Sequence, residues 1–129
     1  MDGRQRLYYA LGQLSYAVAL ADGKIQKEET DKLHEIIQKA SEHINSDYDI
    51  AEIVFTLQSR DHTSLEKSYE WAMEEIKLCK HYFKPQLRND FYYILEAIAN
   101  SSDGVEKHEE RLLDKIQNDI EDIFDKSQR

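Results

Sequence analysis

Apolar residues recur along most of the chain at the spacing of one face of an α-helix. In the first segment, Leu7, Leu11, Leu14 and Val18 are separated by four, three and four residues. Five further segments continue this spacing, beginning near Leu33, Ile50, Leu65, Leu87 and Leu112, and the one that starts at Leu65 continues to Phe83. No segment sustains the apolar–polar alternation of a half-buried strand. The pattern therefore predicts an all-α fold, a single compact bundle of about six helices.

Few residues interrupt these predicted helices. The 129 residues include one proline, Pro85, and four glycines. Pro85 is predicted in the first turn of the fifth helix, where a missing N–H costs nothing. Gly12 lies inside the first helix, which lowers helix stability and indicates a place where another helix crosses closely. Because the length is that of one domain, we expect a single domain over residues 1–129, ordered from about residue 5 to about residue 125.

Two segments of the chain are similar to each other. ALADGKIQKEE (residues 19–29) and NSSDGVEKHEE (residues 100–110) each place Asp-Gly between two predicted helices and follow it with a pair of glutamates. Aligning the Asp-Gly pairs directly loses the match of the apolar positions that follow. A one-residue gap in the second turn, which is one residue shorter than the first, restores that match and aligns Glu29 with Glu109. We expect this second alignment to hold downstream of the turns, which predicts two pseudo-repeated helix–turn–helix units.

The acidic residues around the two turns are candidate cation ligands: Asp22, Glu28, Glu29, Asp103, Glu109 and Glu110. They do not form ordinary calcium loops, because Val18 and Leu20 in the first turn, and Ala99 in the second, occupy positions that need ligating oxygens. If both turns lie at one end of the bundle, their carboxylates repel one another and a hard divalent cation would relieve the repulsion. Alternatively, Asp-Gly ends one helix and the glutamates complement the dipole of the next. The residues leave both interpretations open.

Charge and composition exclude several classes of function. The net charge of −9 argues against binding to nucleic acid and to anionic lipid surfaces. No apolar stretch approaches the ~18 residues of a membrane span, and the N-terminal residues lack the pattern of a secretory signal. A single cysteine, Cys79, rules out an intramolecular disulfide and suits a reducing compartment. We therefore expect a cytoplasmic protein.

The sequence lacks several common motifs for catalysis. It contains no Gly-x-Ser-x-Gly and no phosphate-binding loop, and no histidine has a glutamate three residues before it, as a di-iron bundle needs. We therefore expect a protein that is not an enzyme and requires no cofactor. Eight tyrosines and Trp71 either fill the core or form a partner-binding patch, and periodicity does not separate these alternatives.

The segments LSYAVALADGKIQKEETDKLHEII and LEAIANSSDGVEKHEERLLDKI resemble the two signature segments of the TerB-like family, with a match from about residue 7 to about residue 120. The resemblance implies a compact all-α domain with two related halves, whose acidic residues after each Asp-Gly form a shared metal-linked surface. It also implies an association with bacterial stress responses and no catalytic chemistry. The second segment departs from the first by having Ser102 in place of Ala21 and by being one residue shorter after Asp-Gly. Tellurite resistance itself does not follow from membership of this family.

Together these observations predict a non-catalytic interaction module in the bacterial cytoplasm that binds calcium or magnesium weakly through its paired acidic turns. Its partner would be a protein of unknown identity, or a second copy in a homodimer, with no nucleic acid and no membrane. The alternative is a structural or scaffolding protein without metal, whose acids cap helices and whose exposed aromatic residues bind the partner.

Overall fold

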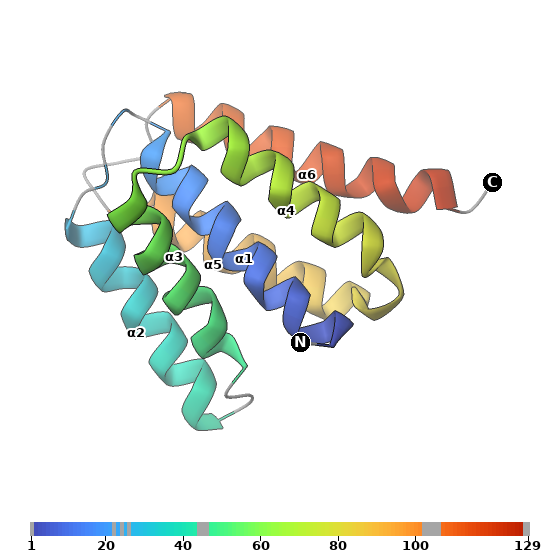
Figure 1. Ribbon diagram of the computed structural model, residues 1–129, viewed down its shortest axis with the longest axis horizontal. Helices are drawn as coiled ribbons and strands as arrows, with labels where there is room; N and C mark the ends of the chain where they lie inside the picture. Colours follow the sequence, from blue (N-terminus) through green and yellow to red (C-terminus); the bar gives the residue numbers. More distant parts are fainter. Residues whose placement is uncertain are drawn as a thin grey trace.

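The computed structural model describes residues 2–21, 23, 25, 27–43, 47–101 and 107–127, and this part of the chain folds into helices without any strand. The predicted all-α bundle is therefore confirmed (Figure 1). Six α-helices and one short 3₁₀-helix, η1, follow in the order α1 (Gly3–Leu20), α2 (Lys27–His43), α3 (Tyr48–Asp61), α4 (Leu65–Leu78), η1 (Lys80–Tyr82), α5 (Pro85–Ala99) and α6 (Lys107–Ser127).

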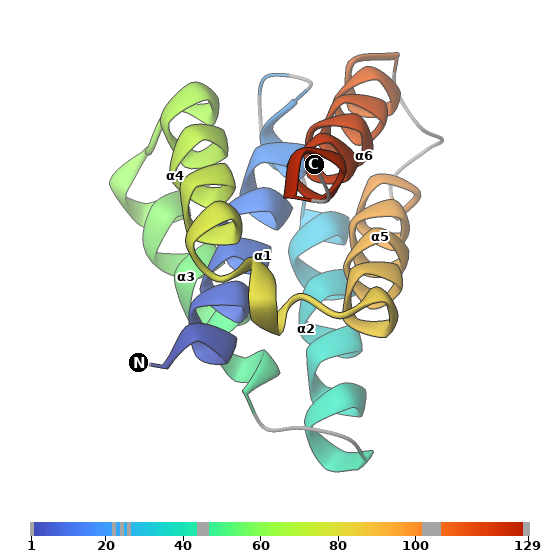
Figure 2. The ribbon, with the colours of Figure 1, turned by 90° about the vertical axis from the view of Figure 1, so that its right-hand side faces the viewer.

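Helix α1 is the centre of the bundle. It contacts α3 and α4 on one side and α5 and α6 on the other, and α2 packs against α3 and α5 (Figure 2). Nearly every residue of α1 from Leu7 to Ala19 is buried. This accounts for its weak amphipathic pattern, since a helix surrounded by other helices is apolar on most of its circumference.

The close crossing predicted at Gly12 is present between α1 and α3. A Cβ atom on Gly12 would lie 2.5 Å from the carbonyl oxygen of Ala51 and 2.8 Å from the Cβ of Val54. The absence of a side chain at this position therefore allows the two backbones to approach each other.

Helix ends follow local capping chemistry. Asp2 caps α1 in a reciprocal capping box with Gln5. The Ser64 hydroxyl accepts a hydrogen bond from the Lys67 backbone N–H at 3.2 Å and starts α4. Pro85 lies in the first turn of α5, as predicted.

The prediction that the fourth helix continues to Phe83 is wrong, because α4 ends at Leu78. The residue before a proline avoids the helical conformation, and Lys84 is extended. The chain turns through η1 and places Phe83 in the core, with its ring centroid 4.7 Å from that of Phe91. The apolar stripe continued beyond the helix because the turn buries the same residue types.

Candidate functional site

Four of the six predicted cation ligands lie in the first turns of α2 and α6, which start at the same end of the molecule, on the left in Figure 1. Asp22 and Asp103 lie outside the described residues. Glu29 and Glu109 are fully buried, each with 0% of its surface exposed, whereas Glu28 and Glu110 are exposed. This burial pattern agrees with the alignment that pairs Glu29 with Glu109.

Glu29 and Glu109 also occupy the same position in their helices. Each is the third helical residue, since α2 begins at Lys27 and α6 at Lys107. A glutamate at this position is typical of a capping box, and its negative charge complements the helix dipole. Burial of a carboxylate is costly unless it is hydrogen-bonded or paired, so both side chains are expected to matter for stability.

No group of three or more His, Cys, Asp and Glu residues among the described residues is arranged to hold a metal ion. The predicted cation site also needs Asp22 and Asp103, which the structure does not describe. The cation site therefore stays a prediction.

A groove of about 880 Å³ runs between α4 and α6, which lie side by side in Figure 1. We call it the α4–α6 groove. Its apolar floor is formed by Leu65, Tyr69 and Met73 from α4 and by Leu112 and Ile123 from α6. Tyr69, Met73 and Leu112 are nearly buried, whereas Leu65 and Ile123 are half-exposed. The floor therefore offers apolar contacts to a ligand without a rearrangement of the core.

A polar contact joins α4 to α6 within this groove. The Tyr69 hydroxyl donates a short hydrogen bond to the Asp119 carboxylate. Lys115 Nζ donates to the same carboxylate at 2.8 Å and lies 4.3 Å from the centroid of the Tyr69 ring. These contacts hold the two helices in register.

The contact also shifts the acidity of both groups. Burial, together with the neighbouring carboxylate, raises the pKa of Tyr69 well above its usual value. Burial acts to raise the pKa of Asp119, but the hydrogen bonds from Lys115 and Tyr69 outweigh it and lower that pKa. Tyr69 is thus a neutral donor near pH 7 and is unsuited to act as a base.

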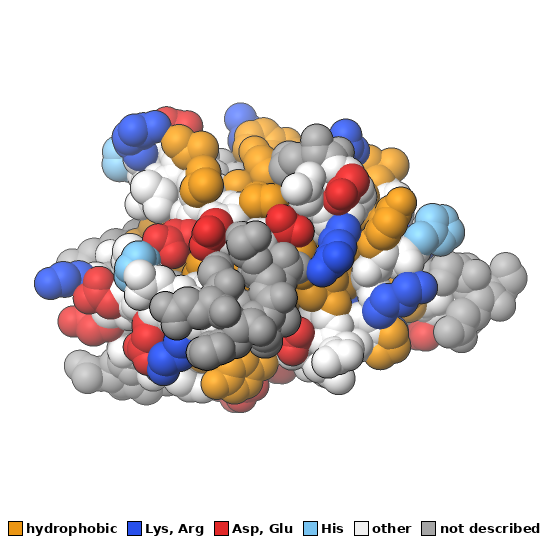
Figure 3. Space-filling view, turned by 90° about the horizontal axis from the view of Figure 1, so that it is seen from below, with side chains coloured by type: hydrophobic (Ala, Val, Ile, Leu, Met, Phe, Trp, Pro, Cys, Tyr) orange, Lys and Arg blue, Asp and Glu red, His pale blue; other side chains and the backbone are white. Residues whose placement is uncertain are grey.

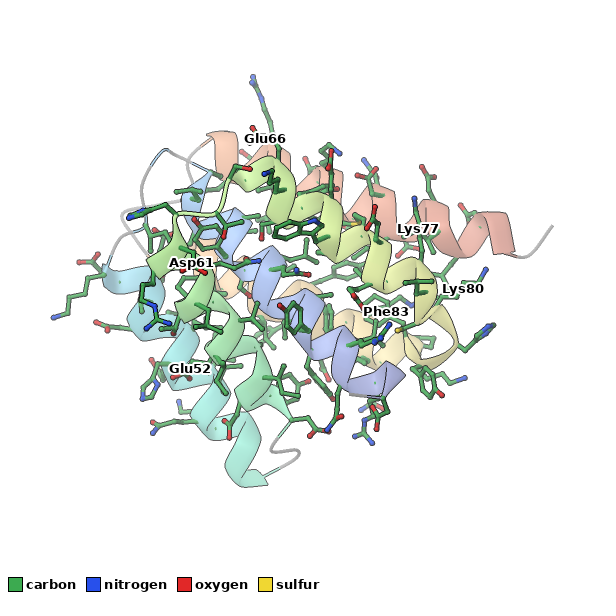
Figure 4. The ribbon with its side chains drawn as sticks, viewed as in Figure 1. Glu52, Asp61, Glu66, Lys77, Lys80 and Phe83 are labelled. Carbon is green, nitrogen blue, oxygen red and sulfur yellow. The ribbon has the colours of Figure 1, made fainter. Side chains whose placement is uncertain are left out.

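Charged side chains line the rims of the groove. Glu66, Glu70 and Glu74 follow one another at four-residue spacing along α4, and Lys77 and Lys80 come after them. Figure 4 shows Glu66 at one end of α4 and Lys77 and Lys80 at the other. Within the described part of the chain, none of these five side chains forms an ion pair within 4.0 Å.

A smaller pocket of about 340 Å³ lies between α5 and α6. Its wall carries the carboxylates of Glu96, Glu110 and Asp114 beside the Tyr92 ring. The Tyr92 hydroxyl donates to Glu121 at 3.1 Å. Of the four predicted cation ligands that the structure describes, Glu110 alone lines one of these two cavities.

The aromatic residues divide between the core and the surface. Tyr8 and Tyr16 are buried, and the Tyr16 hydroxyl donates to the Thr63 carbonyl at 2.6 Å. Trp71, Tyr82 and Tyr93 remain 45%, 54% and 68% exposed. Figure 3 shows the underside of the molecule, where hydrophobic side chains form separate groups among charged ones. Some aromatic residues thus fill the core, whereas a partner-binding patch formed by the exposed ones stays a prediction.

Cys79 has the environment expected of a structural thiol. It is buried, and burial, followed by the neighbouring Glu75, raises the pKa of the thiol. The reactive thiolate is therefore disfavoured near pH 7. None of the described helices is long and apolar enough to cross a membrane.

Sequence reasoning did not find the α4–α6 groove. The apolar spacing assigns Leu65, Tyr69 and Met73 to the face of the fourth helix that enters the core. The structure shows that the apolar stripe is wide enough to contact α1 with one edge and to line the groove with the other. The line of glutamates beside these residues was the available signal.

Comparisons of the chain with protein-family models, with curated proteins and with solved structures gave no significant match.

Proposed function

We propose that this chain is a non-catalytic protein-interaction module that binds an amphipathic helix of a partner protein in the α4–α6 groove. The observation that carries the proposal is the apolar floor between two helices, beside an α4 rim whose glutamates and lysines form no ion pair within 4.0 Å in the described part of the chain. Binding of an amphipathic helix in such a groove is a recurrent mode of peptide recognition.

The dimensions of the groove set the length of the partner helix. The α4 segment that lines it extends from Leu65 to Lys77, which corresponds to about 20 Å of helix. A partner of about four turns would place apolar side chains, spaced by three and four residues, against Tyr69, Met73 and Leu112. Its polar side chains would then face the rims and solvent.

Titration of the isotope-labelled chain with a neutral, leucine-faced amphipathic peptide tests this function by NMR. We expect chemical-shift changes at α4 and α6 amides, and weaker binding to Leu65→Gln, which alters the groove. The matched control is Leu57→Gln, at an exposed leucine of α3 outside the groove. No shift changes, or changes centred on other helices, would contradict the proposal.

A divalent cation at the acidic turns is a second candidate function, favoured by the burial of Glu29 and Glu109 at equivalent helix positions. Thermal unfolding with calcium, magnesium or chelator tests it. A cation at a hundred times its Kd should stabilise the fold by about 2.7 kcal/mol, and the double substitution Asp22→Asn with Asp103→Asn should abolish this shift. Absence of a shift in the wild type would leave these acids as helix caps.

We also propose, from the resemblance of the two turn segments, that the chain is a TerB-like domain that acts in the bacterial cytoplasm in association with stress. The pseudo-repeated helix–turn–helix units support this assignment. An experimental structure that superposes on TerB domains over both halves would strengthen it, and a different connection of the helices would refute it.

A further inference from the structure

Three glutamates of the α4–α6 groove form a line along one rim. Glu66, Glu70 and Glu74 are spaced by four residues, so they lie above one another on one side of α4. Like charges at this spacing destabilise a helix. The line is therefore unfavourable for α4 alone, and a positively charged group beside it would relieve the repulsion.

Of the three lysines that line the groove, only Lys77, three residues after Glu74, is a helical neighbour of this line of glutamates. The lysine that α6 contributes to its lining, Lys115, is engaged with Asp119 and the Tyr69 ring. The remaining lysines of the lining, Lys77 and Lys80, follow the glutamates at the far end of the groove (Figure 4). The α4 rim is thus acidic along the first three turns of the helix and basic at its end.

We propose, on the basis of the proposed helix-binding function, that the partner is a helix with a basic C-terminal half and an acidic N-terminal half, bound antiparallel to α4. Its basic half would lie along Glu66, Glu70 and Glu74, and its acidic half would lie near Lys77 and Lys80. A helix prefers basic residues near its C-terminus and acidic residues near its N-terminus. A partner that follows this preference and also matches the charges of the α4 rim must therefore have its N-terminus near Lys77 and Lys80 and its C-terminus near Glu66.

The total charge supports a partner that is basic overall. The groove lining contains five carboxylates and three lysines, and the whole chain carries a net charge of −9. Opposite charge accelerates association and fixes the orientation of a bound partner, whereas like charge in the reverse orientation is penalised.

Three synthetic peptides of about 15 residues with the same leucine face test the inference. The first has glutamates in its N-terminal half and lysines in its C-terminal half, the second has the reverse arrangement, and the third has glutamines at all these positions. Fluorescence anisotropy measures the Kd of each. We expect the first peptide to bind about tenfold more tightly than the second, which corresponds to a few rim-exposed charge pairs, and the difference to shrink with added salt.

A variant of the protein shows whether the α4 glutamates cause the difference in Kd, or whether the peptides differ for reasons unrelated to the protein. Glu66→Gln, Glu70→Gln and Glu74→Gln, made together, should remove most of the tenfold preference. The matched control removes the same number of charges from exposed acidic residues outside this groove, through Asp31→Asn, Glu35→Gln and Glu96→Gln. The control should retain the preference, because nonspecific attraction by net charge is equal in the two variants.

Three other results of the peptide experiments would contradict the charge inference, the helix-binding function, or both. Equal Kd values for the three peptides, with NMR shifts at α4 and α6, would overturn the charge and orientation inference and leave the helix-binding function intact. Binding of none of the peptides, including the neutral one, would overturn both. Self-association of the chain that the peptides displace, measured by sedimentation equilibrium, would identify a second copy as the occupant and overturn the inferred basic partner.

Discussion

Replacement of Gly12 by alanine tests the close crossing of α1 and α3. A Cβ at this position would lie 2.5 Å from the Ala51 carbonyl oxygen, 3.0 Å from the Ala51 Cα and 2.8 Å from the Val54 Cβ. Two of these three atoms belong to the α3 backbone, which cannot rotate away as a side chain can. The substitution therefore forces α1 and α3 apart, at a point where both are buried against the core.

Two opposing contributions set the size of the effect. Alanine stabilises the interior of a helix by about 1 kcal/mol relative to glycine. Overpacking of a close-packed interior costs about 1 to 3 kcal/mol or more, and a clash with backbone belongs at the upper end of that range. We therefore expect Gly12→Ala to lower the free energy of unfolding by about 2 kcal/mol, which corresponds to a decrease in Tm of roughly 6 to 8 °C for a chain of this length.

Chemical denaturation and differential scanning calorimetry measure this change, and Gly3→Ala is the matched control. A Cβ on Gly3 would lie 2.5 Å from a ring atom of Tyr82. That ring is mostly exposed and free to move aside, so Gly3→Ala should change stability by less than about 0.5 kcal/mol. If Gly12→Ala were as stable as the wild type, α1 and α3 would not cross as closely as described, and the packing around α1 would be refuted.

Three further predictions concern buried polar contacts. Tyr69→Phe should lower the free energy of unfolding by about 1 kcal/mol near pH 7, because it removes the hydrogen bond to the Asp119 carboxylate. The fold lowers the pKa of Asp119, so this stabilisation is present above the unfolded-state pKa of about 4 and is lost as the pH falls through the lower pKa of the folded state. Plots of stability against pH for the wild type and the variant should therefore converge in acid. Ser68→Ala should cost about 2 kcal/mol by denaturation, because the fully buried hydroxyl lies within hydrogen-bond distance of two buried acceptors on α1 and α3, at 2.9 and 2.6 Å. Glu29→Ala and Glu109→Ala should each lower the free energy of unfolding by about 2 kcal/mol, whereas the same change at the exposed neighbours Glu28 and Glu110 should lower it by less than about 0.5 kcal/mol. Equal effects at buried and exposed positions would contradict the burial of Glu29 and Glu109.

Local chemistry made much of the fold predictable. The apolar spacing and the position of Pro85 each depend on interactions within a few residues, and the structure contains both. The close crossing at Gly12 was predictable as well, because an interior glycine costs helix stability and needs a compensating contact. The end of α4 was missed because the turn after Leu78 buries Phe83, and periodicity does not distinguish burial in a helix from burial in a turn.

The candidate sites depend on contacts that are distant along the chain. The repeat identified Glu29 and Glu109 as equivalent, but their full burial follows from how α2 and α6 pack on their neighbours. The short contact between Tyr69 and Asp119 joins residues 50 positions apart. Spacing within one segment gives no information on such a contact, and the groove that it spans was therefore not predictable.

The connection of the helices explains why the groove forms between α4 and α6. The two units that the sequence predicts to be pseudo-repeated, α1 with α2 and α5 with α6, lie towards the two ends of the chain, and α3 and α4 come between them. Helix α4 buries one edge of its apolar stripe against α1, whereas its contact with α6 is slight and depends on the polar bridge of Tyr69 and Asp119. Apolar residues on both helices consequently remain accessible in the groove between them, and the partner helix proposed above would complete the packing that the bundle leaves open there.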